Sequence, residues 1–337
     1  MSFPTSLPRA RTLDPKAAPT LRWGVLGTGW IADRFVASLR KHSSQQVVAV
    51  GSRTQSSAQA FADRHGITAA YGSYEAVVGA ADVDVVYIAT PHNAHLPNAL
   101  LSLEAGKHTL IEKPLGTTAV EARQIAAAAE EAGVFCMEAM WTAFLPKYDV
   151  LRQLLADKAL GGPLSVVADF GEWFADDHRI MRPELAGGPL LDLATYLVTF
   201  ALGALGPVTD VAARGQSAPS GVLGQVGALL THTGGTQSVL HTTLRGNTPT
   251  TAVIAGTEAS LVVDGPFYQP GGFTLTSALG LGSLRYDEEP IAHEGLHFQA
   301  AEVARRITAG EMGSPLRPLA DSIATLDVLD AIESACH

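Results

Sequence analysis

The chain has 337 residues, of which 47% are hydrophobic and 17% are charged. This length suits two domains, and the composition excludes a disordered or fibrous protein. The formal net charge of -10 disfavours contact with nucleic-acid phosphates. No apolar run reaches the roughly 18 residues of a membrane span, so neither a nucleic acid nor a membrane is expected as a partner. Cys136 and Cys336 form no zinc or disulfide pattern and fit a reducing cytoplasm.

The first half of the chain alternates strand-like and helix-like runs. Residues 1–20 contain four prolines and lack the apolar core of a signal peptide, which predicts a flexible N-terminal arm. The expected strands are residues 21–27, 46–51, 85–90, 108–112 and 134–137. The expected helices are residues 30–41, 57–65, 93–105 and 117–132. This alternation predicts a Rossmann domain, a doubly wound parallel sheet, over residues 21–142. A TIM barrel would need eight such units, and the pattern breaks after about Met140.

The second half has a different pattern. Helical runs are expected at residues 146–158, 189–203, 296–309 and 319–335. The expected strands are residues 164–173, 209–213, 225–232, 237–244, 251–254, 260–263 and 273–277. Turn residues at 233–235 and 256–258 predict hairpins. Residues 143–337 are therefore expected to form an α+β domain on a largely antiparallel open sheet.

Glycines follow the first strand. Residues 27–32 read Gly-Thr-Gly-Trp-Ile-Ala, a G-x-G-x-x-A fingerprint at the start of a helix. Gly27 permits the tight turn, Gly29 lets a pyrophosphate approach the backbone, and Ala32 lets the helix pack closely on the sheet. Trp30 and Ile31 complete the candidate cofactor contacts, with core packing as the alternative for Trp30. A tight turn that binds no ligand is the alternative for the whole motif.

The end of the second strand indicates which dinucleotide binds. An enzyme for NAD usually has Asp or Glu here for the ribose 2′-hydroxyl, whereas this chain reads Ser52-Arg53 and has no acid before Asp63. Ser52 can donate to a 2′-phosphate, and Arg53 can pair with it. The sequence therefore favours NADP, with NAD as a possibility. The alternative for Arg53 is a solvated loop arginine.

Three further motifs carry a resemblance to a known family. They are Glu112-Lys113-Pro114, the run Thr90-Pro91-His92-Asn93-Ala94-His95, and the run from Gly187 to Tyr196 with Asp192 inside it. In this order they resemble the glucose–fructose oxidoreductase and inositol dehydrogenase family (Gfo/Idh/MocA). Residues 137–146 look most similar to its branch of dimeric dihydrodiol dehydrogenases and D-xylose dehydrogenases. The chain departs from the family pattern at Ala143, where arginine is common, and at Ala194-Thr195, where a glycine is common.

The resemblance implies hydride transfer at a carbon that bears a hydroxyl or carbonyl group. Tyr196 is the candidate acid/base, and its phenol, with an ordinary pKa of about 10, needs a nearby cation at neutral pH. Lys113 can supply that charge, and Asp192 can orient a substrate hydroxyl or Lys113. The alternatives are a buried helix tyrosine and a surface carboxylate. Further expected cofactor contacts are Thr90, Pro91, His92, His95, Glu112 and Lys113 itself.

Aromatic and basic residues are candidates for substrate contacts. Trp141, Phe144 and Trp173 suit the faces of sugar rings or diols, and Arg179 can bind substrate oxygens; core packing and a solvated loop are the alternatives. His92 and His95 have no third partner at metal-ligand spacing, so no metal is expected.

These features together predict a cytoplasmic NADP(H)-dependent oxidoreductase that acts on a sugar, a keto-sugar or a cyclic diol. The resemblance implies a homodimer or homotetramer that assembles through the C-terminal sheet. Two alternatives stay open at this point. One is a dinucleotide-sensing regulatory protein without turnover. The other is an enzyme that uses a retained nicotinamide internally for glycoside cleavage.

Overall fold

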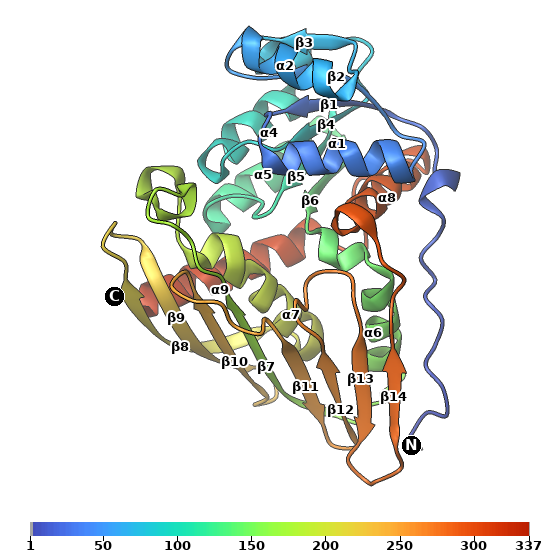
Figure 1. Ribbon diagram of the computed structural model, residues 1–337, viewed down its shortest axis with the longest axis vertical. Helices are drawn as coiled ribbons and strands as arrows, with labels where there is room; N and C mark the ends of the chain where they lie inside the picture. Colours follow the sequence, from blue (N-terminus) through green and yellow to red (C-terminus); the bar gives the residue numbers. More distant parts are fainter. Residues whose placement is uncertain (1–2, 337) are drawn as a thin grey trace. The chain divides into compact units, whose positions relative to one another are not determined.

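The computed structural model describes residues 3–336, which form two compact units (Figure 1). The Rossmann unit contains Leu13–Phe144 and Ala292–Ile323. The sheet unit contains residues 3–12, Leu145–Ile291 and residues 324–336. Residues 292–323 thus return to the Rossmann unit. No local feature of the sequence predicts this return. The domain boundaries at residues 20/21 and 142/143 stay predictions.

The Rossmann unit is built on a six-stranded sheet. Its strands are β1 (Arg22–Leu26), β2 (Gln46–Gly51), β3 (Ala69–Tyr71), β4 (Val85–Ile88), β5 (His108–Glu112) and β6 (Cys136–Ala139). They are all parallel, in the order β3-β2-β1-β4-β5-β6. The doubly wound sheet expected from the sequence is confirmed. The chain reverses its direction of winding between β1 and β4, and ligands of such folds bind at the carboxyl ends of the strands there.

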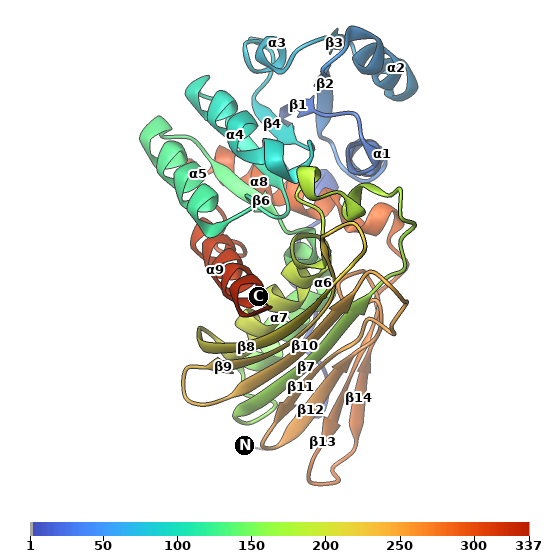
Figure 2. The ribbon, with the colours of Figure 1, turned by 90° about the vertical axis from the view of Figure 1, so that its left-hand side faces the viewer.

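Helices cover both faces of this sheet. They are α1 (Trp30–His42), α2 (Gln55–His65), α3 (Tyr74–Val78), α4 (His95–Glu104), α5 (Ala119–Ala132) and α8 (His297–Thr308). Figure 2 shows α4 and α5 on one face, and α1 and α8 on the other. Gly66 and Gly133 end α2 and α5 with φ angles of 58° and 62°, in the left-handed region that suits glycine at a helix end. The sequence missed β3 and α3, because three half-buried residues and one short turn of helix leave little periodicity.

An aromatic column fixes α1 on the sheet. The ring centroids of Trp23 and Phe35 lie 5.6 Å apart, and those of Phe35 and Tyr87 lie 3.8 Å apart. All three side chains are fully buried. Burying an aliphatic or aromatic side chain of this kind contributes about 1.5–3 kcal/mol. The Trp23 indole N–H donates to Gln45 Oε1 at 2.9 Å, so its polar atom is also satisfied.

The sheet unit is built on an eight-stranded sheet. Its strands are β7 (Pro163–Gly171), β8 (Val208–Ser217), β9 (Leu223–His232), β10 (Gln237–Thr243), β11 (Ala252–Gly256), β12 (Ala259–Val263), β13 (Phe273–Ser277) and β14 (Ser283–Tyr286). The order is β14-β13-β12-β11-β7-β10-β9-β8, and only β7 and β10 pair in parallel within it. The largely antiparallel sheet is confirmed, and β14 is an edge strand that the sequence analysis missed.

Helices lie on one face of the second sheet. They are α6 (Pro146–Ala156), α7 (Thr195–Leu205) and the later part of α9 (Leu319–Cys336). In Figures 1 and 2, α6 and α7 lie against the same face, and no helix within residues 3–336 covers the other. Strand residues alternate accordingly: Val166 and Leu240 are buried, whereas Val167 and Val239 are about half exposed, at 52% and 49%.

One stretch, Pro183–Leu205, is apolar and long enough to cross a membrane by length and composition, although no such run was expected from the sequence. Within the fold, 67% of its most apolar window is buried. Leu197, Val198 and Ala201 of α7 belong to this buried part. A core helix packed against a sheet has the same composition, so the stretch is weak evidence for a membrane span.

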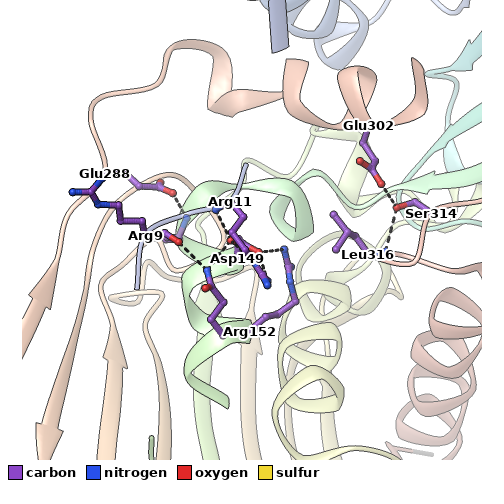
Figure 3. Close-up of polar contacts among 10 residues, drawn as sticks. Arg9, Arg11, Asp149, Arg152, Glu288, Glu302, Ser314 and Leu316 are labelled. Atoms are coloured by element: carbon purple, nitrogen blue, oxygen red, sulfur yellow. Dashed lines mark hydrogen bonds and ion pairs between the residues drawn. The ribbon is translucent and has the colours of Figure 1, made fainter. Parts of the chain in front are cut away.

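The N-terminal arm is bound to α6 (Figure 3). The backbone N–H of Arg11 donates to Asp149 Oδ2 at 2.7 Å, and its guanidinium pairs with Oδ1 at 2.9 Å. Gln153 donates to the carbonyl of Arg9 at 2.9 Å. Burial alone would raise the pKa of Asp149, but the bonds and charge of Arg11 hold it below its usual value. These contacts fix the backbone at Arg9 and Arg11, whereas the sequence analysis expected a flexible arm.

Candidate active site

The turn after β1 has the geometry that a pyrophosphate requires. Gly27 adopts a φ of 106°, and a Cβ there would lie 2.5 Å from the carbonyl oxygen of Ala89. Only glycine fits this approach. A Cβ on Gly29 would meet nothing within 4 Å, so the space over the first N–H groups of α1 is open on this side. Ala32 is fully buried against the sheet, and Trp30 is 70% exposed.

The end of β2 carries hydroxyl groups and an arginine. Ser52 is buried and its N–H donates to the carbonyl of Tyr71 at 3.1 Å, while Arg53 is exposed. Thr54 caps α2 by accepting from the N–H of Ser57 at 3.2 Å. Burial raises the pKa of the Tyr74 phenol, and the nearby positive charge of Arg53 opposes that rise. Residues 52–57 contain an arginine and several hydroxyl groups but no carboxylate, and the N-terminus of α2 adds a partial positive charge.

His95 joins the turns after β4 and β5. Its side chain is fully buried, with Nδ1 at 2.7 Å from the Pro114 carbonyl and Nε2 at 3.0 Å from the Thr90 carbonyl. Burial lowers the pKa of His95, and the two carbonyl contacts oppose that lowering. Thr90 Oγ1 in turn accepts from Asn98 at 3.1 Å. His95 therefore contacts the backbone of the turns after β4 and β5 from their buried side.

Glu112 lies beneath the Lys113 backbone. Its Oε1 accepts from the Tyr87 hydroxyl at 2.5 Å, and its Oε2 accepts from the Lys113 N–H at 3.2 Å. Burial raises the pKa of Glu112 to about 7, against the opposing effects of Tyr87 and Lys113. Glu112 thus holds the turn that carries Lys113. The peptide bond between Lys113 and Pro114 is cis.

Tyr196 lies in the sheet unit within a cluster of aromatic rings. Its ring centroid is 4.6 Å from that of Tyr268 and 6.1 Å from that of Phe170. Tyr268 also stacks on Phe170 at 4.6 Å. Tyr196 is only 7% exposed, so this packing restricts the direction of its hydroxyl. Phe170 and Tyr268 were not predicted as site residues, because aromatic residues in a strand or a loop give no separate signal for a site.

Asp192 precedes α7 in a π-helical turn, Leu190–Ala194. Asp192 lies four residues before Tyr196, a spacing that would place both on one face of an α-helix, but the wider π-helical turn changes that relation. Arg179 donates to Asp192 at 2.8 Å, and the Asp192 side chain is 6% exposed. The structure therefore brings together a predicted substrate residue and a predicted catalytic residue as an ion pair. π-Helical turns occur frequently at functional sites.

The remaining predicted site residues differ in how deeply they are buried. Trp141 and Phe144 are both 4% exposed, in a 3₁₀ turn of the Rossmann unit, which matches their core-packing alternative as well as a pocket wall. Trp173 is 62% exposed after β7. His92 is buried with its ring 5.6 Å from that of His95, and Pro91 is exposed. Ile31 is half-buried beside Trp30. Among residues 3–336, no group of three or more His, Cys, Asp or Glu side chains could hold a metal ion.

Comparison with known proteins gives the family. Residues 21–140 match the model of the GFO/IDH/MocA oxidoreductase family with an NAD-binding Rossmann fold, and residues 148–262 match the GFO/IDH/MocA C-terminal domain. Trans-1,2-dihydrobenzene-1,2-diol dehydrogenase of Sus scrofa is 35% identical over 328 residues, covering 94% of this chain and 96% of the relative. The protein of the same name from Xenopus laevis is 32% identical over 316 residues, covering 92% and 96%.

Two groups of solved structures share the fold. A levoglucosan dehydrogenase in complex with NADH and levoglucosan has a TM-score of 0.85 at 20% identity, covering 94% of this chain and 97% of that one. A 3-ketoreductase from Actinomadura kijaniata with NADP has a TM-score of 0.82 at 24% identity, covering 94% and 98%. With the phosphate-binding turn in place and both family models matched, the chain belongs to the GFO/IDH/MocA family and is an NAD(P)-dependent oxidoreductase that is similar over most of its length to dihydrodiol dehydrogenases.

Proposed function

We propose that this oxidoreductase uses NADP(H) to interconvert a secondary alcohol and a ketone on a cyclic vicinal diol or a related sugar. The observation that carries the cofactor choice is the end of β2, where Ser52 and Arg53 stand in place of a carboxylate. The backbone N–H groups at the N-terminus of α2 add donors for a 2′-phosphate. A carboxylate here would repel that group, whereas a guanidinium can bind it through two hydrogen bonds.

The residues of this chain supply positioning and proton transfer. When bound, the nicotinamide supplies the hydride acceptor or donor. In the oxidation direction the substrate carbon loses a hydride while its hydroxyl loses a proton, and we assign that proton to the Tyr196 phenolate. The ammonium of Lys113 favours the ionised phenol and the developing alkoxide. The ion pair with Arg179 limits the directions that the Asp192 carboxylate can take for a substrate hydroxyl.

The substrate class rests on the rings around Tyr196 and on the similarity to the dihydrodiol dehydrogenases. Phe170 and Tyr268 stack on each other and pack against the Tyr196 ring, so the surroundings of the phenol are apolar and suit an unsaturated ring. The test compares kcat/KM for trans-1,2-dihydrobenzene-1,2-diol and for D-xylose, with NADP+ in both reactions. We expect turnover of both with a preference for the diol. Turnover of neither would reject the substrate class, and a preference for xylose would shift it to sugars.

The exchange of Arg53 for alanine tests the cofactor choice. In Arg53→Ala we expect the Kd for NADPH to rise about 10- to 100-fold, because one charge-assisted contact to the 2′-phosphate is lost. The Kd for NADH should change less than about threefold. Fluorescence titration of both dinucleotides measures this. Arg40→Ala, which removes an exposed arginine near the end of α1, is the matched control. An equal loss for NADPH and NADH in Arg53→Ala would reject the assignment.

We further propose a homodimer or homotetramer that assembles through the uncovered sheet face. Leu229, Val239, Val167 and Val262 are 39%, 49%, 52% and 40% exposed on this face. The strand register places Leu229 beside Val239 and Val239 beside Val167. A contiguous apolar row on an open sheet favours contact with a second copy of the same row.

Two charged substitutions on this face test the assembly. Val167→Lys with Val239→Lys should convert the oligomer to a monomer in light scattering, since each buried amine would lack a partner. Val120→Lys changes a valine on α5 that is 62% exposed, and it should leave the mass unchanged. A monomeric wild-type protein, or an oligomer that survives both lysines, would contradict the proposal.

A cytoplasmic location is part of the same proposal. Cys136 is a buried free thiol and Cys336 is partly buried and free, which suits a reducing compartment. Cell fractionation followed by immunodetection would test it, and recovery from a membrane or secreted fraction would reject it.

A further inference from the structure

Glu138 is a buried carboxylate beside the turn that carries Lys113. It lies on β6, where it pairs with Ile111 of β5 in the strand register. Its Oε1 accepts from the N–H of Leu115 at 2.9 Å, two residues beyond Lys113. On the other side of the turn, Glu112 Oε2 accepts from the N–H of Lys113 itself. Two buried carboxylates thus bind the backbone on both sides of Pro114.

The second oxygen of Glu138 is held by the returning C-terminal segment of the Rossmann unit. Arg317 donates through Nε at 2.7 Å and forms an ion pair through its terminal nitrogen at 2.6 Å. Ser322 donates to the same oxygen at 2.7 Å. The side chains of Arg317 and Glu138 are 4% and 1% exposed, so water screens the pair little. A guanidinium and a hydroxyl on one oxygen fix the direction of the other oxygen.

The segment that carries Arg317 is itself anchored on both α8 and β6. Ser314 donates to Glu302 of α8 at 2.7 Å and accepts from the N–H of Leu316 at 3.2 Å, as Figure 3 shows. The N–H of Cys136 in β6 donates to the carbonyl of Met312 at 3.2 Å. Arg317 therefore projects from a fixed backbone, and its guanidinium can act as a rigid support for Glu138.

We infer that Glu138, held by Arg317 and Ser322, is a positioning residue for Lys113. It acts through the backbone of Leu115, because that hydrogen bond fixes the turn in which Lys113 stands. This inference rests on the proposed function only for the role of Lys113 in the reaction. The support of the turn by Glu138 is a property of the Rossmann unit and can be measured without a substrate.

The test combines hydrogen exchange with kinetics on the full-length protein. Glu138→Gln keeps the size of the side chain but removes the charge that Arg317 binds. We expect amide exchange in residues 113–117 to accelerate about tenfold or more, as follows from the loss of a bond to a charged group. Exchange in the phosphate turn, residues 27–33, should stay at the wild-type rate. With NADP+ and the diol, kcat should fall about 10- to 100-fold, because a small displacement of Lys113 misaligns it.

Variants of Arg317 and Ser322 keep the test valid if Glu138→Gln does not fold. Arg317→Met should reproduce the effect, and Arg317→Lys should restore part of it by returning the charge without the planar fork. Ser322→Ala, the mildest change, should accelerate exchange in residues 113–117 less than Glu138→Gln. Asp84→Asn is the matched control, because it removes the carboxylate that pairs with Arg22 at the opposite ends of the strands. It should leave both exchange and kcat at wild-type values.

Three results would overturn the inference: unchanged exchange in residues 113–117 of folded Glu138→Gln, equal acceleration in residues 27–33, or accelerated exchange with an unchanged kcat. A wild-type protein that turns over neither the diol nor xylose would instead reject the proposed function. In that case the exchange rates of residues 113–117 would still decide whether Glu138 fixes the turn.

Discussion

Tyr196→Phe is expected to lower kcat about 10²- to 10⁴-fold, the range for loss of a general acid or base. The Kd for NADPH should stay within about threefold of the wild-type value, because the phosphate turn belongs to the other unit of the chain. Phenylalanine preserves the ring contacts with Phe170 and Tyr268, so the loss should arise from the hydroxyl alone. Steady-state kinetics with the diol and titration with NADPH measure the two quantities.

A second tyrosine provides the control for this variant. Tyr286 lies on the edge strand β14, where its ring stacks on Phe273 at 5.0 Å. Tyr286→Phe should leave kcat unchanged. Wild-type turnover in Tyr196→Phe would remove Tyr196 from the mechanism, and a large loss of NADPH binding would indicate a structural effect.

Lys113→Met is expected to lower kcat about 10²- to 10³-fold, the range for loss of one group that stabilises developing charge. Methionine keeps much of the length and apolar stem, while the ammonium disappears. In the proposed mechanism the Lys113 charge favours the ionised phenol, so its loss should move the rising limb of the oxidation rate against pH to higher pH. The kcat–pH profile in the oxidation direction measures this shift.

Lys113→Arg should restore little of the activity, since a planar guanidinium cannot replace a compact ammonium in a fixed site. Lys41→Met, which removes an exposed lysine of α1, is the control and should leave the profile unchanged. A lower kcat with an unmoved pH profile would show that Lys113 does not act on the acid/base group. Wild-type kcat in Lys113→Met would exclude it from catalysis.

The parts of the fold that the sequence predicted are those set by local pattern. The Gly27–Ala32 fingerprint required a strand before it and a helix after it, and β1 and α1 stand there. Short β-rich runs between turn residues predicted most strands of the second sheet. The edge strand β14 was not predicted, because its four residues, Ser283-Leu284-Arg285-Tyr286, alternate between exposed and half-buried over too short a run to give a clear signal.

Local sequence patterns could not predict contacts between residues that are separated along the chain. Glu138 and Arg317 are separated by 179 positions, and nothing near either residue signals the pair. The same limit applied to Arg179 and Asp192, which were identified separately as candidates but not as an ion pair. The π-helical turn before α7 was also not predicted, because an α-helical and a π-helical turn share the same apolar composition.

The most direct test of hydride transfer to free NADP+ is a count of turnovers. The purified protein is mixed with excess NADP+ and trans-1,2-dihydrobenzene-1,2-diol, and the NADPH formed is measured against the protein concentration. Many equivalents of NADPH per chain are the expected result. NADPH that stops at one equivalent or less would contradict the account, and would favour a retained nicotinamide or a dinucleotide sensor without turnover.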